Sequence, residues 1–324
     1  MTKVTVLDGS FSTQVSQHVG KSADGDPLWT ARFLATYPDA VVSAHLDFLR
    51  AGSDIIETNT YQASVEGFSK YLGMSETDSL ELIRKAVDLA TQAVNMYKEE
   101  IGSNEEAVNR YPLIAGSCGP YGASLHDASE YTGSYGKCVS KELLKEWHRP
   151  RIQTLIRAGV DLLAIETIPC AEEAEVLVEL LKEFPDTKAW LSFSSSNDGK
   201  TLVDGSDFKE VALNCWRRSR PGQLVAVGIN CVAPHCVNEY LEALRATPEG
   251  KLVPLIVYPN SGEVYVPEEG WKGEARLEIE KYIHQWLDRG VQYIGGCCRV
   301  SALEIAKIRA QVESWRSQER ETSL

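Results

Sequence analysis

The sequence predicts an α/β protein with a single-domain (β/α)8 barrel of the TIM type, and three observations support this prediction. Eight short runs rich in β-branched residues recur along the chain, longer amphipathic patterns of helical period lie between them, and 324 residues suit eight such units. Strands that alternate with helices favour βαβ units and a parallel sheet. An open doubly wound sheet is the alternative. However, the residues from Asp8 to Ser12, after the first predicted strand, lack the glycine pattern of its dinucleotide-binding turn.

The predicted elements follow one another in regular order. The strands are Val4–Leu7, Asp54–Thr58, Leu113–Ser117, Leu162–Glu166, Ala189–Ser194, Leu224–Asn230, Leu252–Tyr258 and Gln292–Gly295. The helices are Val41–Arg50, Glu76–Glu99, Lys141–Arg157, Ala171–Glu183, Phe208–Arg217, Cys236–Ala246, Arg276–Arg289 and Ala302–Arg316. The last helix carries a capping-box pattern, with Ser301 before it and Glu304 in its first turn.

The segment from Gly9 to Pro38 is predicted as a long loop, and long loops in compact domains tend to be functional. There is no internal linker. We therefore assign residues 1–316 to one barrel domain and residues 317–324 to a polar C-terminal tail.

The composition excludes several classes of function. Lys and Arg number 33 against 46 Asp and Glu, and the resulting formal charge of −13 opposes phosphate backbones and anionic lipid surfaces. No run approaches the roughly 20 apolar residues that span a bilayer, and the first apolar run ends too early, at Asp8, for a signal peptide. Eight cysteines are too few for a disulfide scaffold, which predicts a reducing, cytoplasmic setting. We expect no nucleic-acid partner and no membrane partner.

Polar and soft side chains gather at the predicted ends of the strands, where (β/α)8 barrels carry their chemistry. These candidate residues are Asp8, Asn59, Tyr61, Ser117, Cys118, Glu166, Thr167, Ser194, Asn230, Cys231, Tyr258, Asn260, Cys297 and Cys298.

Three of these residues predict a metal site. Cys231 follows the sixth strand and Cys297 and Cys298 follow the eighth, and side chains from alternate strands share a layer in such barrels. Adjacent strand residues face opposite ways, so we expect Gly295-Gly296 to supply the backbone freedom that lets both cysteines serve one site. Three thiolates leave the fourth tetrahedral position of Zn²⁺ open, as in catalytic zinc sites. The natural fourth ligand is a substrate thiol, which the metal would deprotonate into a nucleophile.

Less specific interpretations of the same residues remain open. Asp8 could accept donors of a turn, Glu166 could pair with a core arginine, and Tyr61 and Trp29 could be packing aromatics. A zinc-binding protein without catalysis and a metal-independent barrel enzyme are alternatives to a zinc enzyme. His235 and Cys236 could join Cys231 in a rival zinc site. Cysteines interpreted as small buried hydrophobes are Cys118, Cys138, Cys170, Cys215 and Cys236.

Eight segments resemble those of one known family. They are Leu7-Asp8-Gly9, Asp26-Pro27-Leu28-Trp29, Thr60-Tyr61-Gln62-Ala63, Gly116-Ser117-Cys118-Gly119-Pro120-Tyr121-Gly122-Ala123, Glu166-Thr167, Gly228-Ile229-Asn230-Cys231, Tyr258-Pro259-Asn260-Ser261-Gly262-Glu263 and Gly295-Gly296-Cys297-Cys298-Arg299. The chain thereby resembles the homocysteine S-methyltransferases from its first strand to its eighth. The paired glycines and cysteines with an upstream Asn-Cys are specific features.

The resemblance implies one Zn²⁺ per chain on Cys231, Cys297 and Cys298, with the homocysteine sulfur as fourth ligand. It implies that Asp8 and Glu166 hold the amino group of homocysteine. It also implies that Tyr61 lies beside the metal, as a candidate ligand in the absence of substrate. Gly9 or neighbouring backbone amides could receive the carboxylate, and we assign Asn230 to the same substrate subsite.

The implied activity is methyl transfer to homocysteine. The zinc-bound thiolate would attack the methyl carbon of a sulfonium donor and yield methionine, without a general base at the transfer step. The segments Asp26–Trp29 and Tyr258–Glu263 resemble those of enzymes that use S-methylmethionine or, less efficiently, S-adenosylmethionine. A betaine-dependent enzyme is the alternative, although those relatives carry a long C-terminal arm and this chain stops soon after its last predicted helix. The cobalamin-dependent methionine synthases need further modules, for which 324 residues leave no room. We expect a monomer or weak homo-oligomer.

Overall fold

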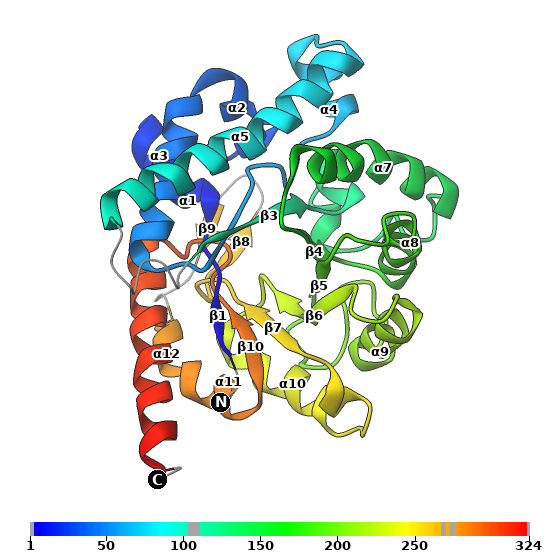
Figure 1. The fold of residues 1–324 in the computed structure, drawn as a ribbon. Coiled ribbons are helices and arrows are strands. Elements are labelled where there is room, and N and C mark those ends of the chain that lie inside the picture. Colours follow the sequence, from blue (N-terminus) through cyan, green and yellow to red (C-terminus); the bar gives the residue numbers. More distant parts are fainter. Residues whose placement is uncertain (1–2, 103–110, 267–269, 273–276, 323–324) are drawn as a thin grey trace.

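Eight parallel strands curve into a barrel, and helices surround it on the outside (Figure 1). The computed structural model describes residues 3–102, 111–266, 270–272 and 277–322. The strands are β1 (Thr5–Val6), β2 (Ile55–Glu57), β3 (Leu113–Cys118), β4 (Leu162–Ile168), β5 (Ala189–Ser194), β6 (Leu224–Asn230), β7 (Leu255–Tyr258) and β10 (Val291–Ile294). Their order in the sheet is β1-β10-β7-β6-β5-β4-β3-β2, and every neighbouring pair is parallel. The predicted fold class is confirmed.

Hydrogen bonds across the seam bring the edge strands β1 and β2 together. The amide of Asp54 donates to the carbonyl of Val6 at 2.7 Å, and Oδ2 of Asp54 accepts from the amide of Val6 at 2.8 Å. Arg309 of the last helix lies 2.5 Å from the same carboxylate. A side chain thus supplies part of the hydrogen bonding that a longer strand pair would supply through its backbone.

The outer helices α3 (Pro38–Ala51), α5 (Glu76–Ile101), α7 (Lys141–Ala158), α8 (Ala171–Leu181), α9 (Phe208–Arg218), α10 (Val237–Arg245), α11 (Ile283–Asp288) and α12 (Ala302–Thr322) match the predicted helices in order. Side chains of Ser75, Ser140 and Asp207 cap α5, α7 and α9 by accepting from backbone amides of the first turn. Glu304 accepts from the amide of Ser301 at 2.8 Å, as the capping-box pattern predicts. None of the described helices is long and apolar enough to cross a membrane.

The segment predicted as a loop from Gly9 to Pro38 is largely helical, so that prediction is wrong. It contains α1 (Phe11–Val19), the 3-10 helix η1 (Trp29–Arg32) and α2 (Phe33–Thr36). These helices are too short for a clear period in the sequence, and their packing against α3 and α5 holds them. The same reason explains the unpredicted helix α4 (Val65–Leu72).

Other boundaries differ from the prediction near the C-terminus. A hairpin of β8 (Val264–Val266) and β9 (Gly270–Lys272) follows β7. The helix predicted from Arg276 begins outside the described residues, and its described part consists of the 3-10 helix η6 (Ile279–Lys281) and α11. Helix α12 continues to Thr322, beyond the predicted end at Arg316, so most of the predicted tail is helical.

The interior of the barrel is filled by side chains from most of the strands. Small residues on the inner face, Ala115, Ala164 and Ala226, leave room for the fully buried indole of Trp190. The indole N–H donates to the hydroxyl of Tyr258 at 3.1 Å. This packed interior leaves the carboxyl ends of the strands as the place for a cavity.

Candidate active site at the carboxyl ends of the strands

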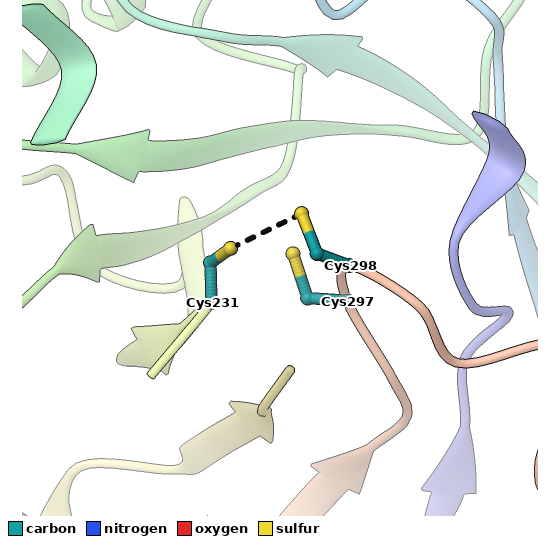
Figure 2. Close-up of side chains that lie close together, drawn as sticks. All are labelled: Cys231, Cys297 and Cys298. Carbon is teal, nitrogen blue, oxygen red and sulfur yellow. Dashed lines mark hydrogen bonds between the residues drawn. The ribbon is translucent and has the colours of Figure 1, made fainter. Parts of the chain in front are cut away.

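The three predicted cysteines converge on one point (Figure 2). Cys231 follows β6, Cys297 and Cys298 follow β10, and the Sγ atoms of all three lie within 4.8 Å of one another. The closest pair, Cys231 and Cys298, is separated by 3.3 Å. Sulfur ligands at about 2.3 Å from a tetrahedral zinc lie about 3.8 Å apart, so the cluster has the size of a three-thiolate zinc site. The predicted convergence is confirmed.

The backbone that brings the thiols together differs from the one predicted. Left-handed φ angles occur at Cys231 (53°) and Arg299 (69°), whereas Gly295 and Gly296 do not adopt them. A Cβ at Gly296 would lie 2.1 Å from Cγ1 of Val300, and one at Gly295 would lie 2.7 Å from Cβ of Leu7. The prediction that the glycines supply backbone freedom is wrong, because their contribution is space for close packing.

A network of hydrogen bonds holds the loop of Cys297 and Cys298 against β7. The amide of Cys297 donates to the carbonyl of Pro259 at 2.8 Å, and the carbonyl of Cys298 accepts from the amide of Ser261 at 3.1 Å. Arg299 forms an ion pair with Glu263 at 3.1 Å. These contacts give Arg299 a structural role, for which the sequence offered no argument.

The thiols share their charge unequally. Hydrogen bonds from Cys297 and Cys298 lower the pKa of Cys231 well below its usual range, and the contact with Cys231 raises the pKa of both partners. Negative charge therefore concentrates on sulfur at one point, where a soft cation would neutralise it. Cys236, the rival ligand, instead points its thiol at the carbonyl of Asn197 at 3.6 Å. The cysteine trio is the one compact cluster of potential metal ligands in the described part of the chain.

Carboxyl groups line a cavity of about 90 Å³ together with the three thiols. Asp8 and Glu166, both predicted, line it together with Glu57. Oδ2 of Asp8 accepts from the amide of Glu57 at 2.8 Å, and the hydroxyl of Ser117 donates to Glu166. Burial raises the pKa of all three carboxyl groups. Serine is thus the close partner of Glu166, in place of the core arginine considered as an alternative.

The sequence analysis missed Glu57. It is the last residue of β2, one position before the predicted strand end, and it follows Ile55 and Ile56. A carboxylate inside an apolar parallel strand is costly unless it has a partner or a function, and this was the available signal.

Aromatic side chains close the cavity on its outer side. The rings of Trp29 and Tyr61 pack edge to face at 5.8 Å, and the hydroxyl of Tyr131 lies 3.8 Å from Sγ of Cys231. Burial raises the pKa of Tyr61 and Tyr131, so both phenols stay protonated at neutral pH. Tyr131 lies in a 3-10 helix, η3 (Ser129–Tyr131), between β3 and α7. It is far from any predicted strand end, so no sequence pattern marked it as a site residue.

The remaining predicted residues take different positions. Gly9 lines the cavity, where a Cβ would lie 2.4 Å from the carbonyl of Val300. Asn230 is fully buried behind the cavity wall: its side chain accepts from the amide of Thr167 at 2.9 Å and donates to Sγ of Cys297 at 3.7 Å. Asn230 therefore ties the end of β4 to the thiol cluster.

A larger vestibule of about 960 Å³ lies outside the aromatic side chains and shares Trp29, Tyr61, Tyr131 and Cys298 with the inner cavity. Acidic groups outnumber basic ones among the charged residues of its lining. Burial lowers the pKa of His126, which is therefore neutral at pH 7, and raises the pKa of Glu130 to about 7. The ionisable groups of the lining, apart from Tyr61, Tyr131 and Cys298, are Lys21, Asp24, Asp26, His126, Asp127, Glu130 and Arg299.

Comparisons with known proteins agree with this geometry. The family model described as homocysteine S-methyltransferase matches residues 5–312. The betaine-homocysteine S-methyltransferase of Drosophila melanogaster is 48% identical over 316 residues, covering 96% of this chain and 94% of the relative. The homocysteine S-methyltransferase YbgG of Bacillus subtilis is 41% identical over 314 residues, covering 95% of this chain and 94% of that relative.

Among solved structures, the metallated form of the homocysteine methyltransferase MmuM from Escherichia coli is similar to this chain. The TM-score is 0.82 at 38% sequence identity, and the match covers 95% of this chain and 96% of that chain.

Proposed function

Because the chain belongs to the homocysteine S-methyltransferase family and is a methyltransferase, we propose that it transfers a methyl group from a sulfonium donor to homocysteine and forms methionine. S-methylmethionine is the preferred donor in this proposal, and S-adenosylmethionine is a slower one. The observation that carries the proposal is the meeting of three thiols with an acid-lined cavity of about 90 Å³.

The donor set suits zinc. Three cysteine sulfurs converge without a fourth histidine, cysteine, aspartate or glutamate ligand among the described residues, which leaves one tetrahedral position for an exchangeable group. When bound, zinc would lower the pKa of a substrate thiol and keep it as a thiolate at neutral pH.

The inner cavity suits the acceptor. Asp8 and Glu166 provide negative charge for the ammonium group of homocysteine, while Gly9 allows close approach of the backbone to its carboxylate. Tyr61 lies between the inner cavity and the vestibule, where it excludes water from the reacting sulfur. Asn230 acts in the substrate subsite through its contacts with Thr167 and Cys297.

The vestibule suits a cationic donor. Its lining carries more acidic than basic groups, and aromatic rings at its inner end can face a sulfonium. The homocysteine sulfur would attack the methyl carbon in line with the bond that breaks. The donor then leaves as a neutral thioether, so no proton moves at this step.

Betaine is the competing donor because a relative at 48% identity carries betaine in its name. A quaternary ammonium also suits an acidic, aromatic-lined vestibule. The long C-terminal arm expected of betaine-dependent enzymes does not distinguish betaine from a sulfonium donor here, because the match covers 94% of that relative.

The test is methionine formation from homocysteine by the zinc-loaded protein, with S-methylmethionine, S-adenosylmethionine and betaine as separate donors. We expect the largest kcat/KM with S-methylmethionine. A larger kcat/KM with betaine would show that betaine, rather than a sulfonium compound, is the preferred donor. Failure to form methionine with any donor would refute the proposed function.

We further propose a cytoplasmic setting, supported by the eight free cysteines, three of which must stay reduced to bind metal. Homocysteine and the methyl donor are the proposed partners, and the oligomeric state proposed is a monomer or weak homo-oligomer.

A further inference from the structure

Three carboxyl groups, rather than the two predicted, line the inner cavity. Glu57 lies between the other two: its amide donates to Oδ2 of Asp8 at 2.8 Å, and its carboxyl group is hydrogen-bonded to Glu166. Asp8 and Glu166 are only 3% and 7% exposed, whereas Glu57 is half-buried. Glu57 is therefore the most exposed of the three acids that line the cavity.

The cavity itself supplies no cation to these acids. Among the residues that the structure describes, its lining contains no lysine, arginine or histidine. Two carboxyl groups in hydrogen-bonding contact repel each other unless they share a proton or a cation. Burial raises the pKa of all three acids, which is the behaviour of carboxyl groups that lack a positive partner.

A cation that contacts all three acids would be larger than a metal ion. In the described part of the chain, only the three cysteines bring ligand atoms within 4.8 Å of one another, so the three acids surround a wider space. A primary alkylammonium fits this space, because it carries three N–H donors on one nitrogen and is attached to a carbon chain. The chain can then extend toward the thiols in the same cavity.

We propose that Glu57 is a third carboxylate of the homocysteine subsite, and that it selects thiols that carry a primary ammonium group. This inference rests on the proposed function, since it takes homocysteine as the acceptor. Glu57 adds a third charge-assisted hydrogen bond to the ammonium, beside those from Asp8 and Glu166.

A purely structural role for Glu57 makes a different prediction. In that case a protonated Glu57 only donates a hydrogen bond to Glu166. A glutamine side chain can donate the same hydrogen bond through its amide, so Glu57→Gln would leave ligand binding unchanged. The isosteric substitution thus separates the two roles.

The experiment measures the dissociation constants of homocysteine and of 4-mercaptobutanoate, which is homocysteine without its amino group, by calorimetry on the zinc-loaded protein. We expect Glu57→Gln to weaken homocysteine binding by about 10- to 100-fold, the range for loss of one hydrogen bond to a charged group, and to leave 4-mercaptobutanoate within twofold. Glu57→Asp keeps the charge, so it should lose less homocysteine affinity than Glu57→Gln. Glu66→Gln on the exposed face of α4 is the matched control and should change neither constant.

Zinc content and the thermal unfolding midpoint of each variant show that the site is intact. Homocysteine affinity of Glu57→Gln within twofold of the wild type overturns the proposal, and so does an equal loss for both thiols. If the wild-type protein binds homocysteine but forms no methionine with any donor, the proposed function fails, while the affinity ratio of the two thiols still decides on Glu57.

Discussion

Replacing Arg151 by methionine should destabilise the protein far more than the same change at its neighbour Arg149. The Arg151 side chain is 2% exposed and lies behind the cavity wall. Its guanidinium donates to the carbonyls of Tyr61 at 2.8 Å and Gly119 at 2.6 Å, and to Nδ1 of His148 at 3.0 Å. These contacts join the ends of β2 and β3 to α7.

The chemistry of arginine fixes the rest of this network. A guanidinium only donates, so Nδ1 of His148 accepts, and its Nε2–H donates to Glu173 at 2.7 Å. Burial lowers the pKa of His148, in agreement with a neutral ring. The positive charge of Arg151 thus compensates the buried charge of Glu173 through the imidazole.

The expected cost follows from what the substitution leaves behind. Arg151→Met removes the positive charge of a buried ionic network and leaves the carboxylate of Glu173 with neutral hydrogen-bond donors only, which costs about 3 to 5 kcal/mol. Arg149 pairs with Glu146 and Glu183 at the surface, and Arg149→Met should cost less than about 1 kcal/mol. The free energy of unfolding of both variants, from urea titration followed by tryptophan fluorescence at pH 7, checks this. A cost for Arg151→Met no larger than that for Arg149→Met would refute the reasoning.

Three further predictions concern the site and the pH dependence of stability. Cys298→Ala should abolish both zinc binding and methionine formation, while Cys138→Ala, at an exposed cysteine, should change neither. Elemental analysis measures the bound zinc, and the methionine assay measures the activity. Full activity in a metal-free variant would contradict the proposed mechanism. Glu166→Gln should raise the KM for homocysteine by about 10-fold or more while zinc stays bound, through loss of a charge-assisted hydrogen bond; an unchanged KM removes Glu166 from the substrate subsite. Burial lowers the pKa of His45 to about 3 in the folded state, so the unfolded chain takes up a proton there first, and stability is lost as pH falls below about 6.5. His45→Leu should therefore lose about 2 kcal/mol less than the wild type between pH 7 and pH 5 in urea titrations, and parallel losses would show that His45 does not titrate in this way.

The barrel could be predicted because its signals are local and repeated. Each run such as Leu224–Asn230 is apolar and bounded by polar residues, and each is followed by a helical pattern. The thiol cluster could be predicted because barrel geometry brings the ends of the sixth and eighth strands together. Both predictions required only the order of the elements.

The features that the sequence did not reveal depend on packing between distant segments. The role of Gly296 follows from the side chain of Val300, and the place of Tyr131 beside Cys231 follows from the path of a long connection. Glu57 was not predicted because the second strand was expected to end one residue later, at Thr58, and site residues were sought after that end. The strand β2 in fact ends at Glu57. Periodicity describes which face a residue occupies, but it does not describe what lies opposite.

Under the proposed function, the division of the site into two compartments would separate acceptor recognition from donor recognition. Asp8, Glu57 and Glu166 stand at the ends of strands, so the sheet fixes their positions. Most residues that line the vestibule lie between Ser12 and Trp29 or between Ala123 and Tyr131, in α1 and in connecting segments, and the others are Tyr61, Gln62, Cys298 and Arg299. In the proposed function, substitutions in these segments would alter the fit of a methyl donor without displacing the acids or the thiols, because the described linings of the two compartments share four residues, Trp29, Tyr61, Tyr131 and Cys298. The proposed function therefore predicts that a change of donor requires changes in the connections, while a change of acceptor requires changes at the ends of the strands.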